Sequence, residues 1–299
     1  MVSETPNTQA MAAGTGEPLA IIAGGGSFPA AVAEAVKRRN RRPVIFAVRG
    51  WADPKVIERY AHHWIAFGQA GRFFRLANAE GCREAVFIGT SLRPALTQIR
   101  PDWRMLRLMP RIAAAFRGGD DRLLSSIAAL FEEEGMRIIG VAEVAPEIIV
   151  PVGTLGRHAP SERDRADISY GFELIAALGP FDIGQAVVVA DRHVVAVEAS
   201  EGTDNMLMRV AQLRSDGRFT KPRGVGVLVK APKPGQDRRF DLPAIGPRTI
   251  EHVARAGLGG LAVAAGSAIV AEPDKTSAAA DHAGIFFIGV APDTAEARP

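Results

Sequence analysis

The sequence predicts an α/β fold with two domains: an N-terminal Rossmann-like domain built on a parallel sheet, and a second α/β domain after it. Its 299 residues reach the length, about 250–300 residues, at which one hydrophobic core stops growing. From Leu19 to Val141, short β-type apolar runs alternate with segments of helical apolar spacing, the pattern of βαβ units.

In the N-terminal half, each expected strand is a short apolar run, and each expected helix carries apolar residues three and four positions apart. The strands are Leu19–Ala23, Val44–Val48, Trp64–Phe67, Ala85–Ile88 and Arg137–Val141. The helices are Pro29–Arg39, Gly71–Glu80, Arg104–Arg117 and Arg122–Glu134.

Closely spaced prolines and glycines between Glu143 and Arg165 break this rhythm. We place a linker at residues 146–165, which leaves an N-terminal domain at 17–145 and a catalytic C-terminal domain at 166–299. Residues 1–16 are small and polar, and we expect them to form a disordered tail.

The C-terminal half repeats the α/β pattern. Its expected helices are Ile168–Leu178, Asn205–Leu213 and Arg248–Ala256, the last framed by Pro247 and Gly257. Its expected strands are Ala186–Ala190, Val194–Ala199, Val225–Val229, Leu261–Ala265 and Phe286–Val290.

The composition narrows the class of function. Hydrophobic residues make up 47% of the chain, enough for large cores, and the net charge is only +3. No long basic run is interleaved with aromatic residues, so we expect no nucleic-acid partner. No apolar run approaches the roughly 20 residues of a membrane-spanning helix, and the N-terminus lacks a signal-peptide pattern. The lone cysteine, Cys82, is expected to pack in a core.

A glycine-rich loop follows the first strand and opens the first helix, where backbone N–H groups can receive an anion. Gly25, Gly26 and Ser27 are therefore candidates for phosphate binding. The dinucleotide fingerprint is a weak match, because Pro29 replaces a glycine and Arg49 stands where an acid should bind the ribose. A tight turn that simply needs glycine is the alternative.

Two further segments of the N-terminal half carry candidate ligand contacts. Thr90 and Ser91 follow the fourth strand, at the same carboxyl edge of the sheet as the glycine loop. Asp120 and Asp121 precede an apolar helix. They are equally consistent with a ligand site and with a helix start, because aspartate is a good N-cap.

Three carboxylates, on Glu198, Glu201 and Asp204, follow an apolar strand at a spacing of three residues. Acids this close need a cation or hydrogen-bond donors nearby, so they are candidates for a Mg²⁺ site. The alternative is that Asp204 caps the next helix and the glutamates are solvated.

A proline-rich polar segment at residues 230–243 contains a second set of candidates. If its second half is extended, Asp237, Arg239 and Asp241 share one face. Lysine and arginine can hold phosphoryl oxygens, and a carboxylate can bind Mg²⁺ or orient a water molecule. A surface loop of ion pairs would look similar.

Taken together, these motifs resemble the LpxI-type UDP-2,3-diacylglucosamine pyrophosphatases of lipid A biosynthesis. The resemblance runs from about Leu19 to Val290. It rests on I-I-A-G-G-G-x-x-P, G-D-D-x-L-L from Gly119, D-I-G-Q from Asp182, E-A-x-E-G-T-D-x-M-L from Glu198, K-A-P-K-P from Lys230 and R-x-D-L-P-x-I-G from Arg239.

This resemblance implies a Mg²⁺-dependent hydrolysis of UDP-2,3-diacylglucosamine to UMP and 2,3-diacylglucosamine 1-phosphate (lipid X), with water attacking the sugar-side phosphorus. It makes Asp241 the first choice for the essential catalytic residue, followed by Asp204 and Glu201. The expected metal ligands are Asp204, Asp237 and Asp241. Asp237 departs from the family pattern, where a longer acid such as glutamate is expected.

The resemblance also implies a ligand held between the two domains. The expected substrate contacts come from both halves of the chain: Gly25, Gly26, Ser27, Thr90, Ser91, Asp120, Asp121, Thr203, Lys230, Lys233, Gln236 and Arg239. A lipid-linked nucleotide sugar implies a cytoplasmic protein that docks transiently on the inner membrane. The oligomeric state stays open between a monomer and a homodimer. Two other functions also stay open: an NADP-linked oxidoreductase using the glycine loop and Arg49, and a non-catalytic protein that binds a phospholipid precursor.

Overall fold

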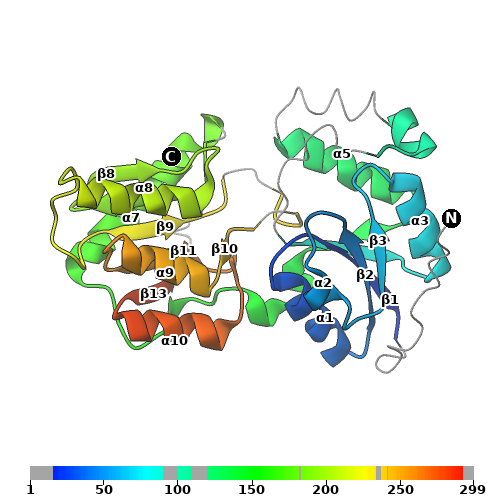
Figure 1. The fold of residues 1–299 in the computed structure, drawn as a ribbon, viewed down its shortest axis with the longest axis horizontal. Helices are drawn as coiled ribbons and strands as arrows, with labels where there is room; N and C mark the ends of the chain where they lie inside the picture. Colours follow the sequence, from blue (N-terminus) through cyan, green and yellow to red (C-terminus); the bar gives the residue numbers. More distant parts are fainter. Residues whose placement is uncertain are drawn as a thin grey trace, which may run out of the picture. The chain divides into compact units, whose positions relative to one another are not determined.

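A computed structural model describes residues 16–89, 100–108, 120–181, 183–233, 237–240 and 242–291, with the side chains of 120–126 excluded. The chain forms two compact units, Met1–Pro146 and Glu147–Pro299, and each contains both helices and strands (Figure 1). The expected tail lies almost entirely outside the described residues, as does the second half of the helix expected at Arg104–Arg117.

The first unit is built on a five-stranded sheet in the order β3-β2-β1-β4-β5. All neighbouring strands are parallel. The strands are β1 (Pro18–Ala23), β2 (Arg42–Val48), β3 (His62–Ile65), β4 (Glu84–Ile88) and β5 (Arg137–Ile138). The predicted parallel α/β sheet is therefore confirmed.

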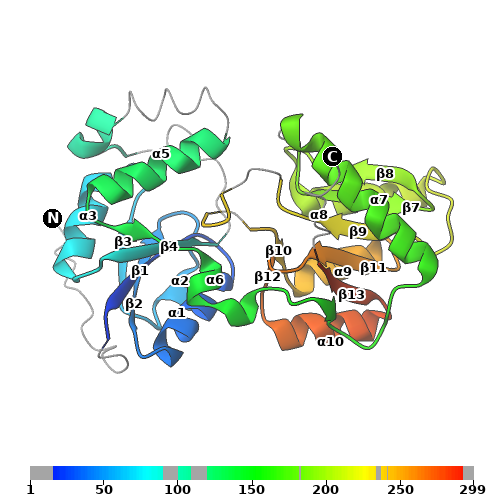
Figure 2. The ribbon, with the colours of Figure 1, turned by 180° about the vertical axis from the view of Figure 1, so that it is seen from behind.

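Helices cover both faces of this sheet (Figure 2). They are α1 (Phe28–Arg38), α2 (Pro54–Ile57), α3 (Ala70–Ala79), α5 (Asp120–Glu133) and α6 (Val141–Val144). On one face, Phe73 of α3 makes an edge-on ring contact with Phe46 of β2, and Phe131 of α5 makes edge-on contacts with Phe74 of α3 and Phe87 of β4. Cys82 is buried, as expected.

The second unit contains a six-stranded mixed sheet in the order β6-β13-β11-β9-β7-β8. Strands β9, β11 and β13 are parallel to one another, whereas β7 runs antiparallel to both β8 and β9, and β6 runs antiparallel to β13. The strands are β6 (Gly153–Thr154), β7 (Ala186–Ala190), β8 (His193–Val197), β9 (Val227–Lys230), β11 (Gly260–Ala264) and β13 (Phe286–Val290). Two short strands, β10 (Ala244–Ile245) and β12 (Ile269–Val270), form a separate pair.

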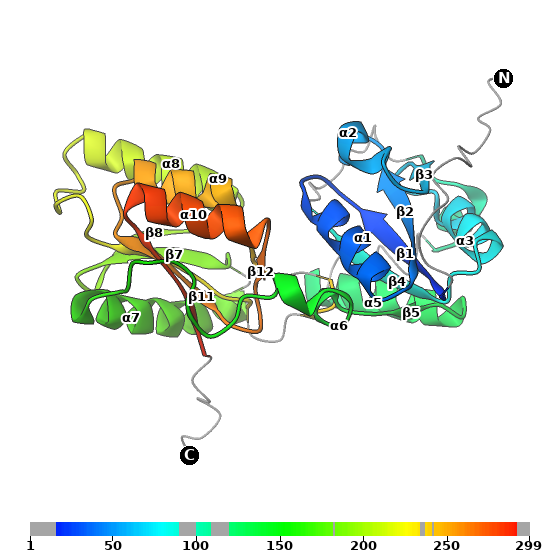
Figure 3. The same cartoon turned by 90° about the horizontal axis from the view of Figure 1, so that it is seen from below.

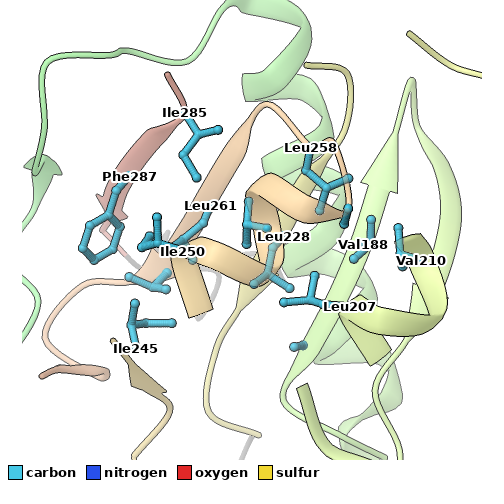
Figure 4. Close-up of a cluster of buried hydrophobic side chains, with 14 of the residues drawn as sticks. Val188, Leu207, Val210, Leu228, Ile245, Ile250, Leu258, Leu261, Ile285 and Phe287 are labelled. Carbon is cyan, nitrogen blue, oxygen red and sulfur yellow. The ribbon is translucent and has the colours of Figure 1, made fainter. Parts of the chain in front are cut away.

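Alternate residues of these strands enter two different cores, because successive side chains of a strand point to opposite faces. Val187 and Val189 pack against α7 (Glu162–Leu178). Val188 and Leu228 face the opposite core, formed with α8 (Gly202–Ser215), α9 (Pro247–Arg255) and α10 (Pro273–Ala283). Figure 3 shows α7 on one side of the sheet and the other three helices opposite, and Figure 4 shows the core beneath them.

The interval 146–165, where we placed the linker, holds ordered elements of the second unit. Strand β6 pairs with β13, and α7 begins at Glu162 with Ser161 as its N-cap. Within the described residues, no helix is long and apolar enough to cross a membrane.

Candidate active site

The glycine loop lies at the point where the strand order of the first sheet reverses. From β1 the chain continues to β2 on one side, and from β4 it continues to β5 on the other side. The neighbouring strands β1 and β4 therefore lie where the strand order reverses, and α/β sheets bind ligands at such a point. The Gly24 N–H donates to the Ile88 carbonyl over 2.9 Å. Gly89 has a φ of +100°, and a Cβ there would lie 2.7 Å from the Gly25 carbonyl oxygen. Glycine is therefore required where the two loops touch.

The predicted phosphate contacts of this unit are placed as follows. Gly25 is buried, Gly26 is exposed, and Ser27 is the N-cap of α1 with no side-chain capping hydrogen bond. Thr90 and Ser91 lie outside the described residues. Asp120 and Asp121 are the first residues of α5, and their side chains are not among those described.

In the second unit, polar groups gather at the edge of the sheet where β8 and β9 end. Both strands run antiparallel to β7, so their carboxyl ends meet at the same edge. There the Lys230 ammonium donates to Oγ1 of Thr203 over 2.9 Å, and Thr203 Oγ1 donates to Oε1 of Glu198 over 2.9 Å. Lys230 is only 6% exposed. This edge therefore offers a fixed cation beside a fixed hydroxyl group.

The other two acids of this segment each have a cationic partner. The Glu201 carboxylate accepts from the Ala199 N–H at 3.1 Å and from the Arg209 guanidinium at 2.7 Å. Hydrogen bonds from backbone N–H groups and then from Arg209 lower the pKa of Glu201, so it is ionised at neutral pH. The Asp204 carboxylate pairs with Arg248 at the start of α9.

The proposed capping role of Asp204 is wrong. Helix α8 begins at Gly202 rather than at Asn205, and Glu201 is its N-cap. Asp204 therefore lies inside the first turn, where a negative charge is favourable near the helix N-terminus. A glycine that tolerates a φ of +77° at 202 allowed the helix to begin earlier than the apolar spacing indicated.

The segment after β9 does not have the extended conformation on which we argued that three side chains share a face. Residues 238–240 form a turn, closed by the Phe240 N–H bonding to the Asp237 carbonyl over 3.1 Å. Within this turn, the Arg239 guanidinium donates hydrogen bonds to both carboxylate oxygens of Asp237, at 2.8 to 3.2 Å. This contact with Arg239 lowers the pKa of Asp237. Gln236 and Asp241 lie outside the described residues.

The described residues contain no cluster of three His, Cys, Asp or Glu side chains that could hold a metal ion. Carboxylate oxygens are suitable ligands for Mg²⁺, but Asp204 and Asp237 each contact an arginine instead of each other. Lys233 is partly buried after the end of β9.

Sequence reasoning missed the partners of the predicted residues. Glu198 was predicted as a possible metal ligand rather than as the partner of Thr203, and Arg209 and Arg248 were assigned no contacts. The signal for Glu198 was its place directly after β8, followed five residues later by Thr203. Nothing local indicated Arg248, because it lies far along the chain from Asp204.

Comparisons with known proteins cover both units. Residues 18–148 match the family model described as the LpxI N-terminal domain, and residues 151–288 match the LpxI C-terminal domain. The chain is 42% identical over 274 residues to the UDP-2,3-diacylglucosamine pyrophosphatase LpxI of Caulobacter vibrioides, covering 92% of this chain and 98% of that protein. The chain therefore belongs to the LpxI family.

Proposed function

We propose that this protein hydrolyses the diphosphate of UDP-2,3-diacylglucosamine to UMP and 2,3-diacylglucosamine 1-phosphate, a step of lipid A biosynthesis. The observation that carries the proposal is the 42% identity to a UDP-2,3-diacylglucosamine pyrophosphatase over nearly the whole of both chains. The buried Lys230 beside Thr203 supports it, because a diphosphate needs cationic and hydroxyl donors around its oxygens.

In the proposed reaction, a water oxygen forms a bond to the sugar-side phosphorus, and the bridging oxygen leaves with UMP. Lys230 and Thr203 donate to non-bridging oxygens, where negative charge must be offset as the phosphoryl group transfers. We assign Asp241 as the catalytic carboxylate. The family resemblance supports this assignment, and Ala244, three residues further along the chain, has its carbonyl oxygen 3.4 Å from the Lys230 ammonium.

We also propose that Asp204, Asp237 and Asp241 hold a Mg²⁺ ion, which would neutralise charge on the diphosphate. Carboxylate oxygens are suitable ligands for this cation. Metal binding would replace the contact of Asp204 with Arg248 and the contact of Asp237 with Arg239. Removal of divalent cations is expected to abolish turnover, and Mg²⁺ to restore it. Asp204→Asn should raise the Mg²⁺ concentration needed for half-maximal rate, whereas Asp216→Asn at the exposed end of α8 should not.

The substrate's acyl chains place it in a lipid bilayer, so we propose that the protein is cytoplasmic and docks transiently on the inner-membrane surface. The glycine loop with Gly25, Gly26 and Ser27 is proposed to contact the nucleotide, as an N–H-rich strand-to-helix turn can. Co-sedimentation with vesicles that carry the substrate, compared with vesicles that lack it, tests the docking.

The test of the activity is incubation of the purified protein with UDP-2,3-diacylglucosamine and Mg²⁺, with the products separated and weighed by mass spectrometry. UMP and the sugar phosphate in equal amounts are expected. Asp241→Ala is expected to lose turnover while retaining the substrate in an equilibrium binding assay. Intact substrate after incubation with folded wild-type protein would reject the proposal.

A further inference from the structure

Glu198 holds its place through both oxygens of its carboxylate. Oε1 accepts the Thr203 hydroxyl at 2.9 Å, and Oε2 accepts the Gln185 backbone N–H at 3.1 Å. Its own backbone N–H donates to the Ala186 carbonyl at 2.9 Å. The carboxylate therefore has a defined orientation at the start of β7 and the end of β8.

The loop before β7 is shaped to reach Glu198. A Cβ at Gly184 would lie 2.1 Å from the Glu198 carbonyl oxygen, far closer than van der Waals contact allows. Only glycine can therefore bring Gln185 near enough to donate to the carboxylate. This gives a physical reason for a glycine before Gln185 in the D-I-G-Q motif, which the proposed chemistry leaves unused.

The direction of each hydrogen bond between Glu198, Thr203 and Lys230 follows from the number of protons that each side chain can donate. A threonine hydroxyl has one proton, and Thr203 donates it in a hydrogen bond to the carboxylate of Glu198. Its oxygen can then only accept from Lys230, whose ammonium has donors and no acceptor. Glu198 thus fixes the direction of the Thr203 hydroxyl, and the hydroxyl fixes one N–H direction of Lys230.

We propose that Glu198 is a positioning residue, which orients Thr203 and through it Lys230 to bind a phosphoryl oxygen of the nucleotide-sugar diphosphate. The inference rests on the proposed function and adds a residue to it. Without Glu198, the Thr203 hydroxyl has no fixed acceptor for its proton and can rotate so that the proton points toward Lys230. The hydroxyl proton and the Lys230 ammonium protons would then repel each other. The ammonium then leaves its place at the sheet edge.

Glu198→Gln tests this with little change in shape. The amide places its acceptor oxygen at only one of the two positions and an N–H₂ donor at the other, so the Thr203 hydroxyl and the Gln185 N–H cannot both keep their present hydrogen bonds. We expect kcat/KM to fall about 10–100-fold, as for a displaced reactive group, with a raised KM. A smaller fraction of folded protein would lower the apparent kcat but would not raise KM. A raised KM therefore distinguishes a positioning role of Glu198 from a purely structural one. Glu173→Gln, on the exposed face of α7, should match the wild type.

Substitutions of Thr203 test the same series of hydrogen bonds, because Thr203 lies between Glu198 and Lys230. Thr203→Val removes the hydroxyl at nearly constant volume, and Thr203→Ser keeps it. Serine is expected to retain much more activity than valine. The double variant Glu198→Gln/Thr203→Val should be no worse than the poorer single variant, because both break one chain.

The outcomes separate this inference from the proposed function. Wild-type turnover together with non-additive losses and a raised KM would support the positioning role. Wild-type turnover with an unimpaired Glu198→Gln enzyme, or with losses that multiply in the double variant, would overturn it. Absence of turnover in the wild type would reject the proposed function, and the positioning role with it.

Discussion

The Lys230 ammonium and the Thr203 hydroxyl lie 2.9 Å apart, although 27 residues separate them in the sequence. Lys230 ends β9, and Thr203 lies in the first turn of α8 after β8. The antiparallel strand β7 between β8 and β9 brings these two ends together. The mixed sheet therefore brings together, from two separate motifs, the two residues that we propose bind a phosphoryl oxygen.

Replacement of Lys230 is expected to impair the chemistry more than the fold. Lys230→Met keeps the length of the side chain and removes its charge. We expect kcat to fall about 10²–10³-fold, the usual effect of losing one donor to a developing charge. Steady-state kinetics measures this, with thermal unfolding as a check on folding. Lys221→Met, which removes a partly exposed ion pair with Asp191, should leave kcat unchanged; equal losses in both variants would contradict the assignment.

Asp167 is expected to support the fold rather than the reaction. It is fully buried in α7, and its carboxylate accepts the backbone N–H groups of Asp191 at 3.0 Å and Arg192 at 2.6 Å. Those two residues form the left-handed turn between β7 and β8. Asp167→Ala leaves both N–H groups without this acceptor, so we expect a loss of about 1–3 kcal/mol in the free energy of unfolding.

Urea unfolding checks this, with Ser169→Ala on the exposed side of α7 as the control. Since the turn lies at the opposite end of β8 from Glu198, the kcat of folded Asp167→Ala protein is expected to be close to that of the wild type. A stability within experimental error of the wild type would show that the turn does not depend on this carboxylate.

The first unit is expected to lose stability in acid partly through Glu80. Burial alone would raise the pKa of this carboxyl group, but hydrogen bonds from Arg42 and His63 outweigh it, and the pKa lies below its usual 4.5. A lowered folded-state pKa contributes stability above the unfolded-state value, and that stability is lost as the pH falls through the folded-state value.

Glu80→Gln removes this contribution. We expect the variant to be less stable than the wild type at neutral pH and the difference to shrink as the pH falls below 4.5. Urea midpoints at a series of pH values give the comparison, and Glu58→Gln at the exposed end of α2 serves as the control. A difference that stays constant down to about pH 3 would contradict the linkage.

Cys82 is expected to be chemically inert in the folded protein. Burial raises the pKa of its thiol to about 11, and the side chain is buried in the first unit. Because the thiolate is the reactive form, a thiol reagent at neutral pH should label Cys82 only after denaturation. Rapid stoichiometric labelling of the native protein would show that the surrounding core opens readily.

The bounds of a strand could be predicted best where it is a continuous apolar run that is buried. Ala186–Ala190 and Phe286–Val290 have the predicted bounds, since each is a short apolar run with a buried interior. Helix α10 was missed because its buried side chains are only Thr276 and Ala280, too few for an apolar period. Its signals were Pro273 at the start and Gly284 at the end. Strands of two residues, such as β10, are too short to show any period.

The candidate site was predictable in its motifs but not in its pairings. The family resemblance and the strand-end position identified Thr203 and Lys230, which the structure brings together. Local spacing placed three acids near one another, but Glu201 and Asp204 each pair with an arginine, and Glu198 accepts from Thr203. The contact of Asp204 with Arg248 depends on α9 packing beside α8, and such a contact leaves no trace in local sequence.

The most direct test of the central claim is hydrolysis of UDP-2,3-diacylglucosamine in water enriched in heavy oxygen, with both products read by mass spectrometry. Attack on the sugar-side phosphorus places the heavy oxygen in 2,3-diacylglucosamine 1-phosphate and leaves UMP unlabelled. Heavy oxygen in UMP would show attack on the other phosphorus and contradict the proposed mechanism, and absence of both products would contradict the activity itself.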